Sequence, residues 1–98
     1  MSYYFIANYD VVDQKMYEQY VQAVRPTLMQ HGAKILAADS EPNNLEGKSG
    51  RTFVILEFES EEAAMNWYNS SEYQAIVDLR LNATEGWARG VPQFVMPS

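Results

Sequence analysis

Hydrophobic positions recur along the chain with two spacings, two residues in some stretches and about four in others. Residues 3–10, YYFIANYD, are rich in aromatic and β-branched side chains and predict a strand. Alternation places Tyr3, Phe5 and Tyr9 on one face, with Tyr4 and Ile6 on the other. A strand that is apolar on both faces is expected at the centre of a sheet that is covered on both sides.

The next stretch has the spacing of an amphipathic helix, with apolar residues every four positions at Met16, Tyr20, Val24 and Leu28. Asp13 can cap its N-terminus, because a carboxylate accepts hydrogen bonds from the free amides of the first turn. Pro26 removes a backbone donor and is expected to kink or break the helix. Gly32, after His31, suits the left-handed position that ends a helix.

Two strands follow the helix. Residues 33–38 predict a less apolar strand nearer a sheet edge, and residues 39–50, DSEPNNLEGKSG, predict a long hairpin loop. Residues 52–59, TFVILEFE, predict the strongest strand, with Val54, Leu56 and Phe58 on one face. Phe53, Ile55 and Glu57 share the other face, so this strand is also expected to be central.

The second helical region has two predicted caps. Ser60 is expected to cap a helix whose first turn carries Glu61 and Glu62. Ser71 and Gln74 fit a capping box that starts a second helix, on which one face carries Tyr73, Ile76, Val77 and Arg80. Residues 82–86 are expected to be a break before a last strand over residues 87–96, which Pro92 confines to an edge or a bulge.

The predicted order is β-α-β-β-α-β, which indicates a single α+β domain over residues 1–98 with the ferredoxin-like plait. Such a plait has a four-stranded antiparallel sheet with both helices on one face. Its first and third strands are central, and these are the two strands that are apolar on both faces. Because helices cover one face only, we expect a second copy to cover the other, giving a homodimer that packs its sheets face to face around a barrel-like core.

Composition removes several classes of function. The 98 residues carry a net charge of -6, which disfavours a nucleic-acid partner. There is no Cys and one His, so thiolate chemistry is excluded and a metal site is not expected. No apolar run is long enough to span a bilayer, so a membrane partner is not expected. The start lacks a signal-peptide pattern, and we therefore expect a cytoplasmic location.

The sequence resembles the domain-of-unknown-function family 1330. The resemblance rests on VILEF at residues 54–58, SEEAA at 60–64, WYNSSEYQ at 67–74 and an earlier pattern of Tyr17, Tyr20, Pro26, His31 and Gly32, with Leu79-Arg80 beyond. It implies membership of the dimeric α/β-barrel superfamily, whose fold is ferredoxin-like. That superfamily includes cofactor-free monooxygenases, lactone isomerases, haem enzymes and stress-response proteins. The family itself implies no catalytic residues.

Three polar residues are candidates for catalysis. Glu57 interrupts an apolar strand and is either a general base in a pocket between sheet and helices, or an ion-paired or solvated residue. His31 is either an acid–base group at a pocket rim or, as we favour, a histidine that caps helix carbonyls. Arg80 could pair with Glu57 or bind a ligand carboxylate, although we favour a stem that covers apolar surface.

Large aromatic residues are the candidates for a ligand pocket, namely Trp67, Tyr68 and Tyr73. Core and interface packing is the interpretation that we favour for them. No Gly-rich phosphate loop or nucleophile elbow is present, and we expect no bound cofactor. A haem or a flavin is disfavoured, since the single His is the only strong axial ligand candidate and no flavin motif is visible.

Three functions remain compatible with these residues. The first is an enzyme that acts without a bound metal on a small metabolite, and it requires at least two of Glu57, His31 and Arg80 to line one cavity. The second is a non-catalytic dimer that binds a small molecule or takes part in a stress response, with a pocket that lacks an acid–base pair. The third is a structural dimer whose pocket is filled by its own side chains.

Overall fold

The computed structural model describes residues 1–97 and confirms the ferredoxin-like α+β fold. The last residue of the expected domain, Ser98, lies outside the described residues. The strands are β1 (Tyr3–Val11), β2 (Lys34–Asp39), β3 (Thr52–Phe58) and β4 (Thr84–Pro92). The helices are α1 (Gln14–Gln30), α2 (Glu61–Tyr68), α3 (Ser71–Gln74) and α4 (Val77–Ala83).

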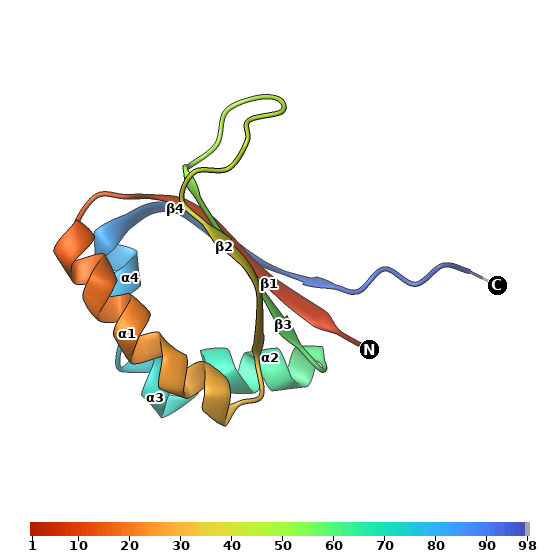
Figure 1. Cartoon of the computed structure of the whole chain (residues 1–98). Helices are drawn as coiled ribbons and strands as arrows, with labels where there is room; N and C mark the ends of the chain where they lie inside the picture. Colours follow the sequence, from red (N-terminus) through yellow and green to blue (C-terminus); the bar gives the residue numbers. More distant parts are fainter. Residues whose placement is uncertain (98) are drawn as a thin grey trace.

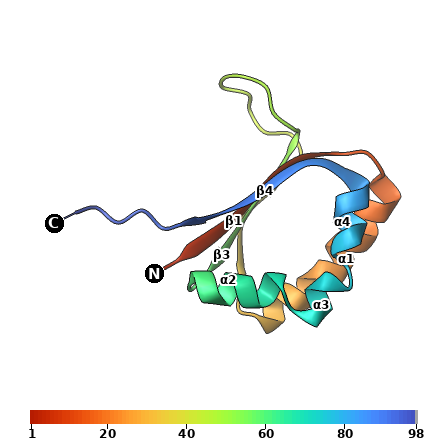
Figure 2. The same ribbon diagram turned by 180° about the vertical axis from the view of Figure 1, so that it is seen from behind.

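The four strands form one antiparallel sheet in the order β2-β3-β1-β4. The two strands predicted to be central, β1 and β3, are central, and they pair with Phe5 opposite Leu56 and Ala7 opposite Val54. All the helices lie on one side of the sheet (Figure 1). Seen from behind, the other side carries no helix, and the chain after β4 runs away from the sheet near the N-terminus (Figure 2).

Local chemistry explains where the helices begin. The Asp13 carboxylate accepts from the Met16 amide at 3.1 Å, and the Ser60 hydroxyl accepts from the Ala63 amide at 3.0 Å, so both predicted caps are confirmed. Gly32 has a φ of 69°, the left-handed conformation expected after α1. Of the kink or break expected at Pro26, the break is wrong, because α1 continues through Pro26 to Gln30, and the kink stays a prediction.

The second helical region differs most from the prediction. The cap of α3 is Ser70, whose hydroxyl accepts from the Tyr73 amide, and not Ser71. The single helix expected there is two short ones, α3 and α4, separated by Ala75 and Ile76. The break expected over residues 82–86 is also wrong, since β4 starts at Thr84 directly after α4 and ends at Pro92.

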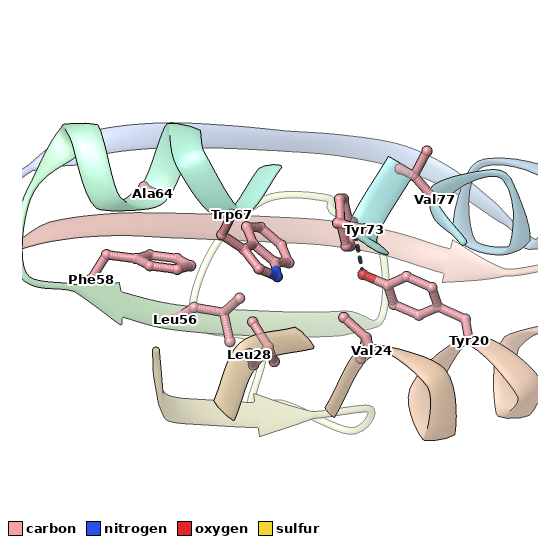
Figure 3. Close-up of a cluster of buried hydrophobic side chains, with 9 residues drawn as sticks. All are labelled: Tyr20, Val24, Leu28, Leu56, Phe58, Ala64, Trp67, Tyr73 and Val77. Atoms are coloured by element: carbon pink, nitrogen blue, oxygen red, sulfur yellow. Dashed lines mark hydrogen bonds between the residues drawn. The ribbon is translucent and has the colours of Figure 1, made fainter. Parts of the chain in front are cut away.

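The core lies between the helices and the sheet, with Trp67 at its centre (Figure 3). Trp67 is 1% exposed and packs against Phe58 at a ring-centroid distance of 5.4 Å and against Tyr73 at 4.1 Å. Its indole N–H donates to the Thr27 hydroxyl at 3.0 Å, so the polar atom of the largest core side chain is satisfied. Leu56 and Phe58 point into this core from β3, which fixes the face that each β3 side chain takes.

Candidate functional site

A cavity of about 140 Å³ lies between α1 and the helix-facing side of the sheet. An engineered apolar cavity of roughly 150 Å³ in another protein holds benzene, so this volume corresponds to one small ring. Most of the lining is apolar or tyrosine: Phe5, Ala7, Tyr9, Tyr17, Tyr20, Val21, Val24, Leu28, Ile35, Ala38, Val54 and Leu56. Two arginines, Arg25 and Arg80, complete it.

Arg80 reaches the cavity from α4 and is only 5% exposed. Its Nε donates to the Tyr73 hydroxyl at 3.4 Å, the one hydrogen bond that its side chain makes within residues 1–97. In the same part of the chain, the single fully buried side-chain polar atom that lacks a partner is Nε2 of His31. The two Nη groups of Arg80 therefore keep access to open space, and the space next to them is the cavity.

The charge of Arg80 is supported by hydroxyl groups. Burial lowers the pKa of Arg80, but the neighbouring tyrosines Tyr73, Tyr20 and Tyr68 together outweigh burial and raise the pKa above its usual value. No carboxylate of residues 1–97 lies within 4.0 Å of the guanidinium. Since an isolated buried charge is costly, a protein that keeps one next to a cavity has an arrangement suited to an anionic ligand.

Two pairs of tyrosines lie beside the guanidinium. The hydroxyl oxygens of Tyr20 and Tyr73 are 2.9 Å apart (Figure 3), and those of Tyr9 and Tyr17 are 2.7 Å apart. Burial raises the pKa of Tyr9 and of Tyr20 well above the usual value, and the partner hydroxyl in each pair raises it further. Both therefore stay protonated near neutral pH, and the hydroxyl that is not donating within a pair can donate to a ligand.

The catalytic candidates are not brought together. Among Glu57, His31 and Arg80, only Arg80 lines the cavity. Glu57 alternates with Leu56 and Phe58, which face the helices, so Glu57 lies on the other face of the sheet, between Tyr4 and Lys34 in the strand register. The expected pocket between sheet and helices cannot contain Glu57, and no ion pair joins it to Arg80.

His31 is the C-terminal cap of α1, and its backbone amide donates to the last carbonyls of that helix. Its ring lies outside the cavity lining, although Nε2 is buried without a partner. His31 thus lies at the helix end as expected, but its Nε2 bonds to no carbonyl of residues 1–97, so capping by the side chain stays a prediction. Its ring is separate from the cavity that Arg80 lines.

The aromatic residues expected to line a pocket pack in the core. Trp67 and Tyr73 are 1% and 0% exposed, and neither they nor the half-buried Tyr68 belong to the cavity lining. Tyr73 still matters to the site, because its hydroxyl accepts from Arg80 and shares a hydrogen bond with Tyr20.

The sequence interpretation missed Tyr9, Tyr17 and Tyr20 as site residues. The signal was present: Tyr9 falls on the helix-facing side of β1, and Tyr17 and Tyr20 fall on the apolar stripe of α1. Tyr9 on β1 faces Tyr17 and Tyr20 on α1, so all three side chains line the same cavity between α1 and the sheet.

A larger concavity of about 920 Å³ lies within the loop between β2 and β3. It is lined by Glu41–Arg51 and Phe53, nearly all of them exposed to solvent. We assign the site to the smaller cavity, because only that one contains a buried charged group. Within residues 1–97 no group of three potential metal ligands of the His, Cys, Asp or Glu type is present, and no helix in this range is long and apolar enough to cross a membrane.

Solved structures with the same fold are known. A protein of unknown function from Rhodopseudomonas palustris is 14% identical, with a TM-score of 0.76 over 99% of this chain and 84% of its own. A dimeric ferredoxin-like protein of unknown function from Thermobifida fusca is 15% identical, with a TM-score of 0.65 over 95% and 92%. SnoaB, a cofactor-independent oxygenase from Streptomyces nogalater, is 7% identical, with a TM-score of 0.68 over 99% and 98%.

At these identities the structures show a shared fold. No curated protein matches the sequence. The family model named Domain of unknown function (DUF1330) matches residues 2–93, nearly the whole chain, and confirms the resemblance seen in its motifs. The chain belongs to the domain-of-unknown-function family 1330.

Proposed function

We propose that this protein binds a small organic anion in the cavity between α1 and the sheet, with the anionic group on Arg80. The observation that carries the proposal is a guanidinium that is 5% exposed, lacks a carboxylate partner within residues 1–97, and lines a ring-sized cavity. A guanidinium offers a planar fork of donors that matches a carboxylate in two parallel hydrogen bonds.

The charges around the cavity support an anion over a cation or a neutral ligand. The chain has 13 acidic and 7 basic residues, yet the only charged residues in the cavity lining are Arg25 and Arg80. The remaining polar groups in the lining are tyrosine hydroxyls, and those of Tyr9 and Tyr20 stay protonated and so can donate. Although the protein as a whole is acidic, the wall of this cavity is therefore positively charged and carries several hydrogen-bond donors.

Binding is preferred over acid–base catalysis because the lining contains no Asp, Glu or His. A side chain that could remove a proton from a ligand is therefore not at the cavity wall, and the enzyme hypothesis loses the convergence of Glu57, His31 and Arg80 on which it depended. The same lining matches the non-catalytic hypothesis, which requires a pocket without an acid–base pair.

The test is ligand-induced stabilisation with benzoate as the probe. A ligand that binds only the folded state at 100 times its Kd stabilises that state by about 2.7 kcal/mol. We expect benzoate to raise the melting temperature of the wild-type protein, and benzyl alcohol, which has the ring without the charge, to leave it unchanged. An equal shift for Arg80→Met and wild type with benzoate would remove the proposal.

A second function is favoured by the set of hydroxyl donors around Arg80. The same donors that bind a carboxylate also stabilise an enolate oxygen, so the cavity could assist proton exchange next to a carbonyl group with solvent as the base. SnoaB, which has the same fold, is described as a cofactor-independent oxygenase, and this agrees with a site that acts without a bound cofactor. Exchange of the methyl protons of pyruvate for deuterium, followed by NMR, tests it: equal rates with wild type and Arg80→Met exclude it.

We also propose that the protein is a homodimer whose subunits pack through the helix-free faces of their sheets. Strand register and alternation place a set of largely apolar side chains on this face: Tyr4, Ile6, Phe53, Ile55, Trp87 and Val91. Trp87 is 40% exposed and Val91 is 38% exposed in the single chain. Similar structures from Thermobifida fusca and Bacteroides fragilis are described as dimeric, which supports a second copy as the cover.

A further inference from the structure

Helix α1 presents two adjacent rows of side chains to the sheet. The inner row is Tyr20, Val24 and Leu28, all buried in the core. The outer row is Tyr17, Val21 and Arg25, which follow each other at intervals of four residues and line the cavity. The outer row therefore places a hydroxyl at one end, an apolar side chain in the middle and a guanidinium at the other end.

The two arginines of the cavity differ in position and in burial. Arg80 lies beside the tyrosine hydroxyls, because it bonds to Tyr73 and is coupled electrostatically to Tyr9 and Tyr20. Arg25 is exposed and lies further along α1. A helix rises about 1.5 Å per residue, so the backbone of Arg25 lies roughly 7.5 Å beyond that of Tyr20 along the helix axis. Arg80 therefore forms the inner positive end of the cavity and Arg25 forms the outer one.

The wall between these ends is apolar. Val21, Val24 and Leu28 come from α1, and Ile35 and Val54 come from the sheet. No carboxylate belongs to the lining, so neither arginine is neutralised there by a lining residue. Two cations separated by an apolar wall are complementary to an apolar body with an anionic group at each end.

We propose that the ligand of this cavity is a short dianion, such as a dicarboxylate, whose inner carboxylate binds Arg80 and whose outer carboxylate binds Arg25. The inference rests on the proposed anion binding at Arg80 and adds a role for Arg25. Arg25 sets specificity: it distinguishes a dianion from a monoanion of the same shape.

Two probes of nearly the same shape test the role of Arg25. Terephthalate carries two carboxylates on one ring, and 4-methylbenzoate replaces one of them by a methyl group. Because Arg25 is exposed, solvent weakens its ion pair, and we expect wild type to bind terephthalate about fivefold more tightly by calorimetry at low ionic strength. Arg25→Met is expected to reduce this difference to about twofold, the statistical factor for a ligand with two equivalent carboxylates, and to leave the affinity for 4-methylbenzoate unchanged. Arg80→Met is expected to lower the affinity for both ligands.

Lys15→Met is the matched control, because Lys15 is an exposed cation on the same helix outside the cavity lining. Lys15→Met changes the net charge by the same amount as Arg25→Met, and the Lys15→Met protein is expected to keep the fivefold preference for terephthalate over 4-methylbenzoate. Equal affinities of wild type for both probes, or an equal loss of preference in Lys15→Met, would overturn the role of Arg25 while leaving anion binding at Arg80 intact. Failure of both probes to bind wild type would overturn anion binding as well.

Discussion

Nε of Arg80 lies 3.4 Å from the hydroxyl oxygen of Tyr73, a side chain with no exposed surface at all. That hydroxyl is in turn 2.9 Å from the hydroxyl of Tyr20 on α1. The guanidinium is thus oriented by the core itself, through a residue that also packs against Trp67. A binding group fixed in this way loses little conformational freedom when a ligand arrives.

Replacing Arg80 by Met is expected to remove anion binding without unfolding the protein. The charge is buried without a carboxylate partner, so its removal relieves a desolvation cost, and the Met side chain keeps most of the apolar contacts of the arginine stem. Urea denaturation should therefore show an unfolding free energy that is equal to or above that of wild type. A loss of several kcal/mol in Arg80→Met would instead show that Arg80 has mainly a structural role. Glu57→Gln is a suitable comparison for binding, because Glu57 lies on the other face of the sheet and should leave benzoate binding unchanged.

Stability is expected to fall at alkaline pH because of Tyr9 and Tyr20. In the folded protein the pKa of each is raised above the ordinary value of 10.0 by burial and by the neighbouring tyrosine. The unfolded chain then releases protons that the folded protein retains, so the stability present below pH 10 is lost as the pH rises above it. Each tyrosine contributes a slope of about 1.4 kcal/mol per pH unit.

The measurement is urea denaturation at pH values from 9 to 11.5, with tyrosine ionisation followed by absorbance. Tyr20→Phe removes one of the two groups and should make the decline less steep, while its own stability at pH 7 falls by about 1 kcal/mol through the lost hydrogen bond. An unchanged slope in Tyr20→Phe would mean that the hydroxyl of Tyr20 ionises as easily in the folded protein as in the unfolded chain.

Removing the acceptor of the hydrogen bond between Trp67 and Thr27 is expected to lower the unfolding free energy by more than the usual net contribution of one hydrogen bond. In Thr27→Val the size of the side chain is kept, but the indole N–H of a residue that is 1% exposed loses its acceptor. An unsatisfied buried donor costs about 1–3 kcal/mol, and Thr27→Val should lower the unfolding free energy by that amount. In the double variant with Trp67→Phe the Thr27 effect should shrink, because no donor remains to be left unsatisfied. Additive effects would show that the two side chains do not interact.

Ile55→Asp is expected to convert the proposed dimer into a monomer. Ile55 lies on the helix-free face of a central strand, where a buried carboxylate without a partner would oppose association. Sedimentation should give a mass near twice 11.2 kDa for wild type and near 11.2 kDa for the variant. A wild-type mass of one chain at micromolar concentration would contradict the proposed dimer.

Hydrophobic alternation was sufficient to predict the sheet. Strands β1 and β3 are apolar on both faces, and that one property placed them at the centre before the topology was known. The helix starts at Asp13 and Ser60 were equally predictable, since a cap depends on a single side chain and its neighbouring amides. The start of α3 was not, because Ser70 and Ser71 are chemically equivalent caps and only tertiary packing chooses between them.

Of the residues that line the proposed cavity, only Arg80 was among the candidates taken from the sequence. Arg80 drew attention because a charge sits among apolar residues on its helix face. Glu57 drew attention for the same reason, but the open face of the sheet also is apolar, so parity alone could not tell the cavity side from the other side. Tyr9 and Tyr17 were overlooked because tyrosine is an ordinary core residue, and their role follows only from the 2.7 Å between hydroxyls contributed by a strand and a helix.

The second helical region is divided into three short helices. This division places the core aromatic residues and the cavity arginine on different helices, whereas a single long helix would carry them all. Helix α2 holds Trp67, α3 holds Tyr73, and α4 carries Arg80. Substitutions in α4 can alter the reach or the chemistry of position 80 while the two aromatic anchors stay in place. On the proposed function, relatives that share Arg80 would bind the same class of anion, and a relative with another residue at position 80 would recognise a different class of molecule.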